Sequence, residues 1–189
     1  MLPLHQGGMA LRPPLVCQRT DNGVMTEPDD VDRIVAAWRR ERPDLDVSPL
    51  EVLSRVSRIA KRVERARKEA FRASALESWE FDVLAALRRA GTPYQQSPTQ
   101  LMEENMVSSG AMTHRITKLA GRGFVVREAD PDDGRGVVVR LTPAGLTAVD
   151  HALELLVRAE HSLVQALSPA QQSEAVTALR VLSRDAASR

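Results

Sequence analysis

A chain of 189 residues is long enough for one domain with a sizeable hydrophobic core, or for a small domain with helical additions. Hydrophobic residues make up 43% of the sequence but aromatic residues only 3%, so the core must consist mainly of Leu, Val and Ala, which favours helices. The 26 Lys and Arg nearly cancel the 25 Asp and Glu, and a net charge of +1 excludes any argument for a nucleic-acid partner from bulk charge.

Residues 1–24 contain several prolines and glycines without a helical or alternating period, and they predict a disordered tail. The tail lacks the apolar stretch of a secretory signal, and no later run is long enough for a membrane span. The only cysteine, Cys17, has no companion for a disulfide or a zinc site, which fits a reducing compartment. We therefore expect a cytoplasmic protein with no membrane partner.

An extra N-terminal helix is predicted over residues 27–42. Apolar side chains recur there at spacings of three and four residues, namely Val31, Ile34, Val35 and Trp38. The helix should end at ERPD, because Pro43 disfavours helical geometry at Arg42.

A short pattern marks the starts of later helices. Ser is followed by Pro, and Glu or Gln stands three residues after the Ser, in SPLE at 48–51, SPTQ at 97–100 and SPAQ at 168–171. The Ser can cap the helix, the Pro fits the first helical position, and the Glu or Gln can close a capping box. TPAG at 142–145 offers a similar cap without the acidic or amide partner. Each segment therefore predicts a helix start.

The helix after Ser48 should run to about Phe71, with an apolar stripe on one face and basic residues on the other. The next helix, from about Ser78 to Ala90, is apolar almost all round, which predicts a central, buried helix closed by Gly91. The loop GTPYQQ then leads to a short helix starting at Ser97.

After the turn VSSG, a second helix is predicted in AMTHRITKLAGRG, where Gly121 and Gly123 end the helical pattern. FVVRE and VVVRL read as two β-branched strands, joined by ADPDDGRG. Two long helices with leucine-rich stripes complete the chain.

In this order, these elements form a winged helix-turn-helix, so the predicted fold class is mainly α with a small β-hairpin (α+β). Residues 75–141 form the DNA-binding domain, and residues 48–74 and 142–186 form a helical dimerisation region. One helix must enter the major groove while its other side packs on the core, and a thin hairpin must reach the neighbouring groove or phosphates.

The predicted recognition helix has two distinct faces. Met112, Ile116 and Leu119 share one side, and small or polar residues occupy the other, as a base-reading face requires. The candidate DNA contacts on this helix and the preceding turn are Ser108, Ser109, Gly110, Thr113, His114, Thr117 and Lys118.

The loop between the two strands is the predicted wing tip. Gly134 and Gly136 free the backbone around Arg135, whose guanidinium can then enter a narrow minor groove, and Asp133 can restrain it. Taken by itself, this loop would favour the solvated, charged tip of an ordinary hairpin. The pair of helices immediately upstream favours contact with DNA instead.

The run from SWEFDVLAAL through SSGAMTHRITKLAGRGFVVREADPDDGRGVVVRLTPAG resembles the MarR family of bacterial regulators. The wing signature D-x-R of that family is matched by Asp133 and Arg135, and the resemblance covers about residues 48–186. It implies an obligate homodimer, formed by the first and last helices, that binds pseudopalindromic double-stranded DNA.

A narrower resemblance is to the urate-responsive branch of that family, which has an extra N-terminal helix. The matching residues are Trp38, Asp82, Arg115 and Arg127. They imply a small anionic aromatic ligand, such as urate, that releases the DNA.

The residues themselves leave an alternative open. Asp82 lies among apolar neighbours, where an unpaired charge would be costly, and an arginine is its natural partner. A plain buried ion pair that fixes the recognition helix therefore competes with a ligand role. Arg115 points towards the inner side of its helix, away from bases. Trp38 could equally be a core or interface anchor.

The sequence thus favours a ligand-responsive transcriptional regulator, acting as a repressor. A redox-sensing regulator would need a cysteine on the first family helix, whereas Cys17 lies in the tail. An enzyme is not indicated, because the histidines (His5, His114, His151 and His161) form no ligand-spaced group, and we expect no catalytic residues, metal or cofactor. A regulator of the same family that responds to other phenolic or carboxylate ligands, or a helical interaction protein without DNA affinity, remain alternatives.

Overall fold

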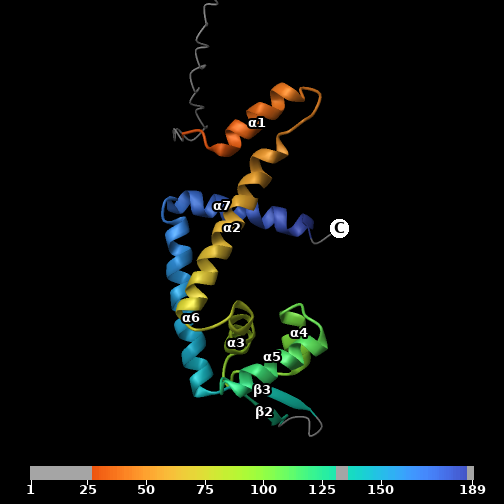
Figure 1. Ribbon diagram of the computed structural model, residues 1–189, viewed down its shortest axis with the longest axis vertical. Helices are drawn as coiled ribbons and strands as arrows, with labels where there is room; N and C mark the ends of the chain where they lie inside the picture. Colours follow the sequence, from red (N-terminus) through yellow and green to blue (C-terminus); the bar gives the residue numbers. More distant parts are fainter. Residues whose placement is uncertain (1–26, 131–135, 187–189) are drawn as a thin grey trace, which may run out of the picture. The chain divides into compact units, whose positions relative to one another are not determined.

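The computed structural model describes residues 27–130 and 136–186 (Figure 1). The elements in chain order are α1 (Asp30–Glu41), α2 (Pro49–Ala73), α3 (Ser78–Arg89), β1 (Gln95–Gln96), α4 (Pro98–Glu104), α5 (Ser109–Gly121), β2 (Val125–Ala129), β3 (Val137–Leu141), α6 (Pro143–Val164) and α7 (Pro169–Ala186). The predicted tail with Cys17, and the wing-tip residues Asp133 and Arg135, lie outside the described residues. None of the described helices is long and apolar enough to cross a membrane.

The chain divides into two compact units at Ala60 and Lys61, within α2. The first unit contains α1 and the start of α2. Asp29 caps α1 and forms a capping box with Asp32, and Val31 and Val35 are buried. Arg55 of α2 joins the two helices of this unit through ion pairs with Asp29 and Asp32.

The capping pattern correctly predicts all four helix starts, because α2, α4, α6 and α7 each begin at the Pro of the pattern. Ser97 and Gln100 form a capping box, Ser168 and Gln171 exchange the same two hydrogen bonds, and the Thr142 hydroxyl accepts from the Gly145 N–H. At Ser48 the predicted box is wrong, although α2 does begin at Pro49. Among the described residues, the Glu51 carboxylate pairs with Arg39 of α1 instead, and the Ser48 N–H donates to Asp46 at 2.9 Å.

The second unit contains the winged helix-turn-helix. Its antiparallel sheet has the strand order β1-β3-β2, so the predicted hairpin of β2 and β3 gains a third strand from the GTPYQQ segment. Gln95 pairs with Arg140 and Gln96 with Val139. Two residues are too few to show an alternating pattern, and their extended conformation is stabilised by hydrogen bonds to β3.

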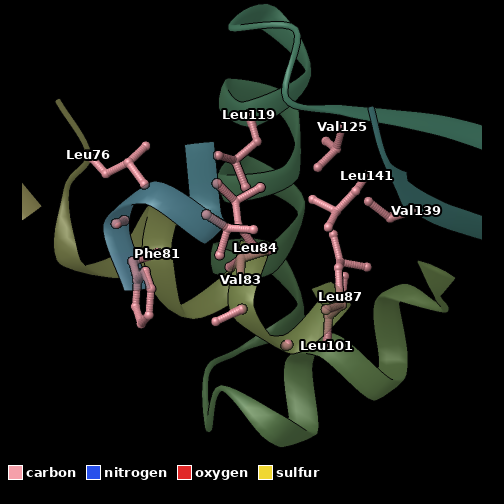
Figure 2. Close-up of a cluster of buried hydrophobic side chains, with 14 of the residues drawn as sticks. Leu76, Phe81, Val83, Leu84, Leu87, Leu101, Leu119, Val125, Val139 and Leu141 are labelled. Carbon is pink, nitrogen blue, oxygen red and sulfur yellow. The ribbon is translucent and has the colours of Figure 1, made fainter. Parts of the chain in front are cut away.

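The core of this unit surrounds α3, as the sequence predicts. Leu84 and Leu87 of α3 are fully buried, and they lie among side chains from α4, α5 and the sheet (Figure 2). Leu119 of α5 and Val139 of β3 are also fully buried. α5 is therefore fixed by one side, and its other side remains available to a partner.

Two hydrogen bonds join the start of α6 to the turn that follows α5. The Thr142 hydroxyl donates to the Gly123 carbonyl at 2.7 Å, and its backbone N–H donates to the Phe124 carbonyl at 3.0 Å. A Cβ atom at Gly145 would overlap that same Phe124 carbonyl oxygen. Glycine is thus required here by close packing between α6 and the base of the wing.

Candidate nucleic-acid interface

The recognition helix α5 has the two faces that its sequence predicts. Met112, Ile116 and Leu119 are buried. Every candidate DNA contact predicted on this helix and its preceding turn is exposed: Ser108, Ser109, Gly110, Thr113, His114, Thr117 and Lys118. Ser108 also caps the helix by accepting from the Ala111 N–H at 3.3 Å. The exposed face is small and polar, and it is presented by a helix whose other side is fixed in the core.

Arg127 of β2 binds to this exposed face. Its Nη2 atom donates to the Thr117 hydroxyl at 2.9 Å and to the Thr113 carbonyl oxygen at 3.2 Å. The Thr117 hydroxyl in turn donates to the Thr113 carbonyl at 2.9 Å. A residue predicted to bind ligand therefore contacts two residues predicted to bind DNA.

Arg115 lies on the other flank of α5, turned away from the base-reading face. Its guanidinium stacks over the Trp79 ring at 5.7 Å from the centroid. Asp82 is exposed, and it has no hydrogen-bond or ion-pair partner among the described residues. The predicted pairing of a buried Asp82 with an arginine is thus absent from the described chain.

The buried acid of α3 is Glu80 rather than Asp82. Glu80 is 3% exposed, and its side chain accepts from the Glu77 N–H at 3.0 Å and pairs with Arg122. Arg122 follows α5, where it also donates to the Ala75 carbonyl at 2.9 Å and stacks on Phe124. Sequence reasoning missed this pair, although the spacing of Glu77 and Glu80 at a helix start is a capping-box signal.

A cleft of about 760 Å³ lies between the end of α2, the start of α3 and the end of α5. Phe71, Leu76 and Trp79 provide apolar walls. Its basic lining residues are Lys68, Arg72, Lys118 and Arg122. Arg122 is neutralised by Glu80, whereas Arg72 and Lys118 have no acidic partner among the described residues. The cleft therefore combines apolar surface with positive charge next to the recognition helix.

The predicted ligand residues belong to both units. Trp38 is 49% exposed on α1, in the first unit, whereas Asp82, Arg115 and Arg127 belong to the second. Within that second unit, Arg115 and Arg127 lie on opposite flanks of α5 through their contacts with Trp79 and Thr117. Their joint role in binding a ligand stays a prediction.

The described part of the wing consists of two paired strands. Arg140 of β3 donates to Glu128 of β2 at 2.9 Å, and this hydrogen bond lowers the pKa of the Glu128 carboxyl. Residues 131–135 lie outside the description, so the predicted contacts of Asp133 and Arg135 stay predictions. Over the described ranges, no group of His, Cys, Asp and Glu side chains could hold a metal ion.

The chain is similar to known regulators. Residues 76–136 match the model of the MarR family. The chain is 37% identical over 153 residues to the HTH-type transcriptional regulator PecS of Dickeya dadantii, covering 81% of this chain and 90% of PecS.

Solved structures share the fold. BpsR of Bordetella bronchiseptica, whose structure concerns regulation of DNA binding by 6-hydroxynicotinic acid, is 26% identical with a TM-score of 0.58, over 70% of this chain and 92% of BpsR. A mutant MarR from E. coli in complex with operator DNA is 23% identical with a TM-score of 0.59, over 77% of this chain and 96% of that one. The PecS match and the winged helix-turn-helix together establish that the chain belongs to the MarR family of DNA-binding transcriptional regulators.

Proposed function

We propose that this regulator is a homodimeric repressor that binds pseudopalindromic DNA and is released by a small anionic ligand. The observation that carries the proposal is the exposed, small and polar face of α5 above its buried Met112, Ile116 and Leu119 stripe. That face would enter the major groove, and the wing with Asp133 and Arg135 would follow the adjacent minor groove. The structure of the E. coli relative in complex with operator DNA supports DNA as the partner.

The proposed dimer rests on apolar side chains that the described chain leaves exposed. α6 and α7 carry Leu153, Val157, Leu163, Val176, Leu179 and Leu182, and α2 carries Leu53, Val56 and Ile59. Exposed apolar stripes of this extent are typical of obligate interfaces. A twofold dimer would read two half-sites about 10 base pairs apart.

The proposed ligand is a planar aromatic anion, urate or a chemically similar compound. Arg115 borders Trp79, which also lines the cleft. Arg72 and Lys118, which have no acidic partner in the described part of the chain, provide attraction for an anion. BpsR, whose DNA binding is regulated by 6-hydroxynicotinic acid, supports this ligand class. In the proposal Arg115 neutralises the charge of the ligand and the exposed Asp82 is repelled by it, whereas the ligand contacts predicted for Trp38 and Arg127 stay predictions.

A gel shift on the upstream region of the gene tests the proposal. The protein should bind with an affinity that falls steeply as salt rises, and a panel of urate, 6-hydroxynicotinate, salicylate and benzoate should release the DNA selectively. Light scattering at micromolar concentration should give a dimer. Absence of salt-dependent DNA binding, or a monomer, would overturn the respective part of the proposal. A response to salicylate or benzoate but not to urate would favour the wider ligand class.

A further inference from the structure

The hydroxyl group of Thr117 is already engaged within the protein. It donates its proton to the Thr113 carbonyl at 2.9 Å and accepts a hydrogen bond from Arg127 at 2.9 Å. A hydroxyl has one donor and two acceptor lone pairs. Thr117 therefore has no proton left to donate to a base, although it occupies the exposed face of α5.

This bonding pattern limits what Thr117 can read in a major groove. The purine N7 atoms, guanine O6 and thymine O4 are all acceptors, so they cannot be recognised by a hydroxyl that has no free proton. The hydroxyl keeps one acceptor lone pair, which could bind only an amino group such as adenine N6 or cytosine N4, and the other group of the side chain is the methyl. In the major groove, a threonine methyl makes its apolar contact with the C5-methyl group of thymine.

Arg127 is fixed in this arrangement by its surroundings. The adjacent acid on β2, Glu128, is paired with Arg140 of β3 and so is not available to draw Arg127 away. Arg127 also donates to the Thr113 carbonyl, so its guanidinium joins two successive turns of α5. The hydroxyl of Thr117 is thereby held by partners on both α5 and β2.

We infer that Thr117, positioned by Arg127, selects thymine in each half-site through a methyl contact. The inference rests on the proposed placement of α5 in the major groove. Arg127 acts as a positioning residue here, because it fixes the Thr117 hydroxyl and need not touch a base itself.

Substitution of deoxyuridine for thymine tests the methyl contact directly. After footprinting of the upstream region, each thymine of a half-site is replaced in turn, and the affinity of the full-length protein is measured. Loss of one contacting methyl should lower the affinity about fourfold at one position of each half-site. Full affinity after every replacement would overturn the inference while leaving the DNA-binding function intact.

Two variants of Thr117 separate the methyl from the hydroxyl. Thr117→Ser keeps the hydroxyl but removes the methyl, and it should abolish discrimination between thymine and deoxyuridine at that position. Thr117→Val keeps a methyl and removes the hydroxyl that Arg127 holds. Because Val has one strongly preferred rotamer in a helix whereas Thr has two, its methyl needs no such positioning, and the variant should retain the discrimination. The opposite result for either variant would show that the hydroxyl reads the base and would overturn the inference.

The positioning role of Arg127 has its own readout. Arg127→Leu should reduce the thymine preference at that same position, with an unchanged melting temperature, and Arg127→Lys should restore part of it. Arg158→Leu serves as the matched control, because it makes the same chemical change at an arginine of α6 that pairs with Glu154, away from the base-reading face. Equal thymine preference in Arg127→Leu and the wild type would overturn the positioning role. Failure of the wild type to bind any DNA would instead overturn the proposed function.

Discussion

Arg122, directly after α5, pairs with Glu80, the buried carboxylate in the first turn of α3. The pair joins two segments that lie 42 positions apart in the sequence. It connects the end of the recognition helix to the central helix of the core, and it forms part of the wall of the basic cleft.

Arg122→Ala should lower the free energy of unfolding by about 2 kcal/mol. The change leaves a buried charge without its partner, and the cost is below that of a fully buried pair because Arg122 itself is 38% exposed. Arg158→Ala, which removes an exposed pair with Glu154, is the matched control and should change stability by no more than about 0.5 kcal/mol. Urea denaturation compares the two, and equal effects would contradict a special role for the Glu80 pair.

Gly145→Ala should destabilise the protein by about 2 kcal/mol or more, because the added methyl overlaps the Phe124 carbonyl and forces α6 away from the wing. Gly121→Ala is the control, since a Cβ there meets nothing within 4 Å. The control should be neutral or slightly stabilising. Thermal melts of both variants measure the difference, and a neutral Gly145→Ala would refute the close packing.

The attachment of α1 to α2 should weaken in acid. Burial opposes ionisation of Asp29, but hydrogen bonds from Arg55 and from the backbone of Asp32 and Val31 outweigh it and lower the pKa of Asp29 to about 2. A lowered folded-state pKa contributes stability above the ordinary value of 3.8, and that contribution is lost as the pH falls towards 2. Because Asp29 is half exposed, we expect about 1 kcal/mol at neutral pH.

Tryptophan fluorescence can follow this acid effect. The chain has 2 tryptophans, so a Trp79→Phe variant keeps only Trp38, whose fluorescence reports on α1. In that background, Arg55→Gln should destabilise the packing of α1 at pH 6 and make little difference at pH 2. A difference between the proteins with and without the Arg55→Gln change that persisted at pH 2 would be inconsistent with the ion pair as its cause.

Asp82→Asn should separate ligand response from DNA binding. The side chain is exposed, so loss of its charge should alter stability by no more than about 0.5 kcal/mol. If Asp82 couples the ligand to α5, the ligand concentration for half-release of DNA should rise about tenfold. An unchanged response in the gel shift would leave Asp82 without a role in the switch.

Arg135→Ala tests the sequence-based wing prediction. Loss of a minor-groove guanidinium should weaken DNA binding without a change in melting temperature, because the sequence predicts a wing tip at Arg135 and such a residue contributes little to stability. The slope of log affinity against log salt should fall by about 1, as expected for one lost phosphate neighbour. Normal affinity at physiological salt would exclude Arg135 from the interface.

Local patterns of the sequence were sufficient for most of the fold. The spacing of Met112, Ile116 and Leu119 predicts the buried face of α5, because a helical period is a property of adjacent turns. The same holds for the caps at Ser97 and Ser168, whose partners lie three residues away. The order of these predicted elements also correctly predicted the winged helix-turn-helix, and the family resemblance agreed with it.

Contacts between distant segments were decided only by the tertiary structure. ESWEFD offers both Glu80 and Asp82 to the core, and Glu80 is buried because Arg122 and the Glu77 N–H are placed to bind it. Glu51 binds Arg39 instead of closing a capping box, and Gln95 becomes a strand residue because β3 supplies hydrogen bonds. A short-range sequence pattern carries no information about which distant residue will lie next to a given side chain. The sequence therefore determined the helices and strands, and their packing determined which charged side chains are buried, paired or exposed.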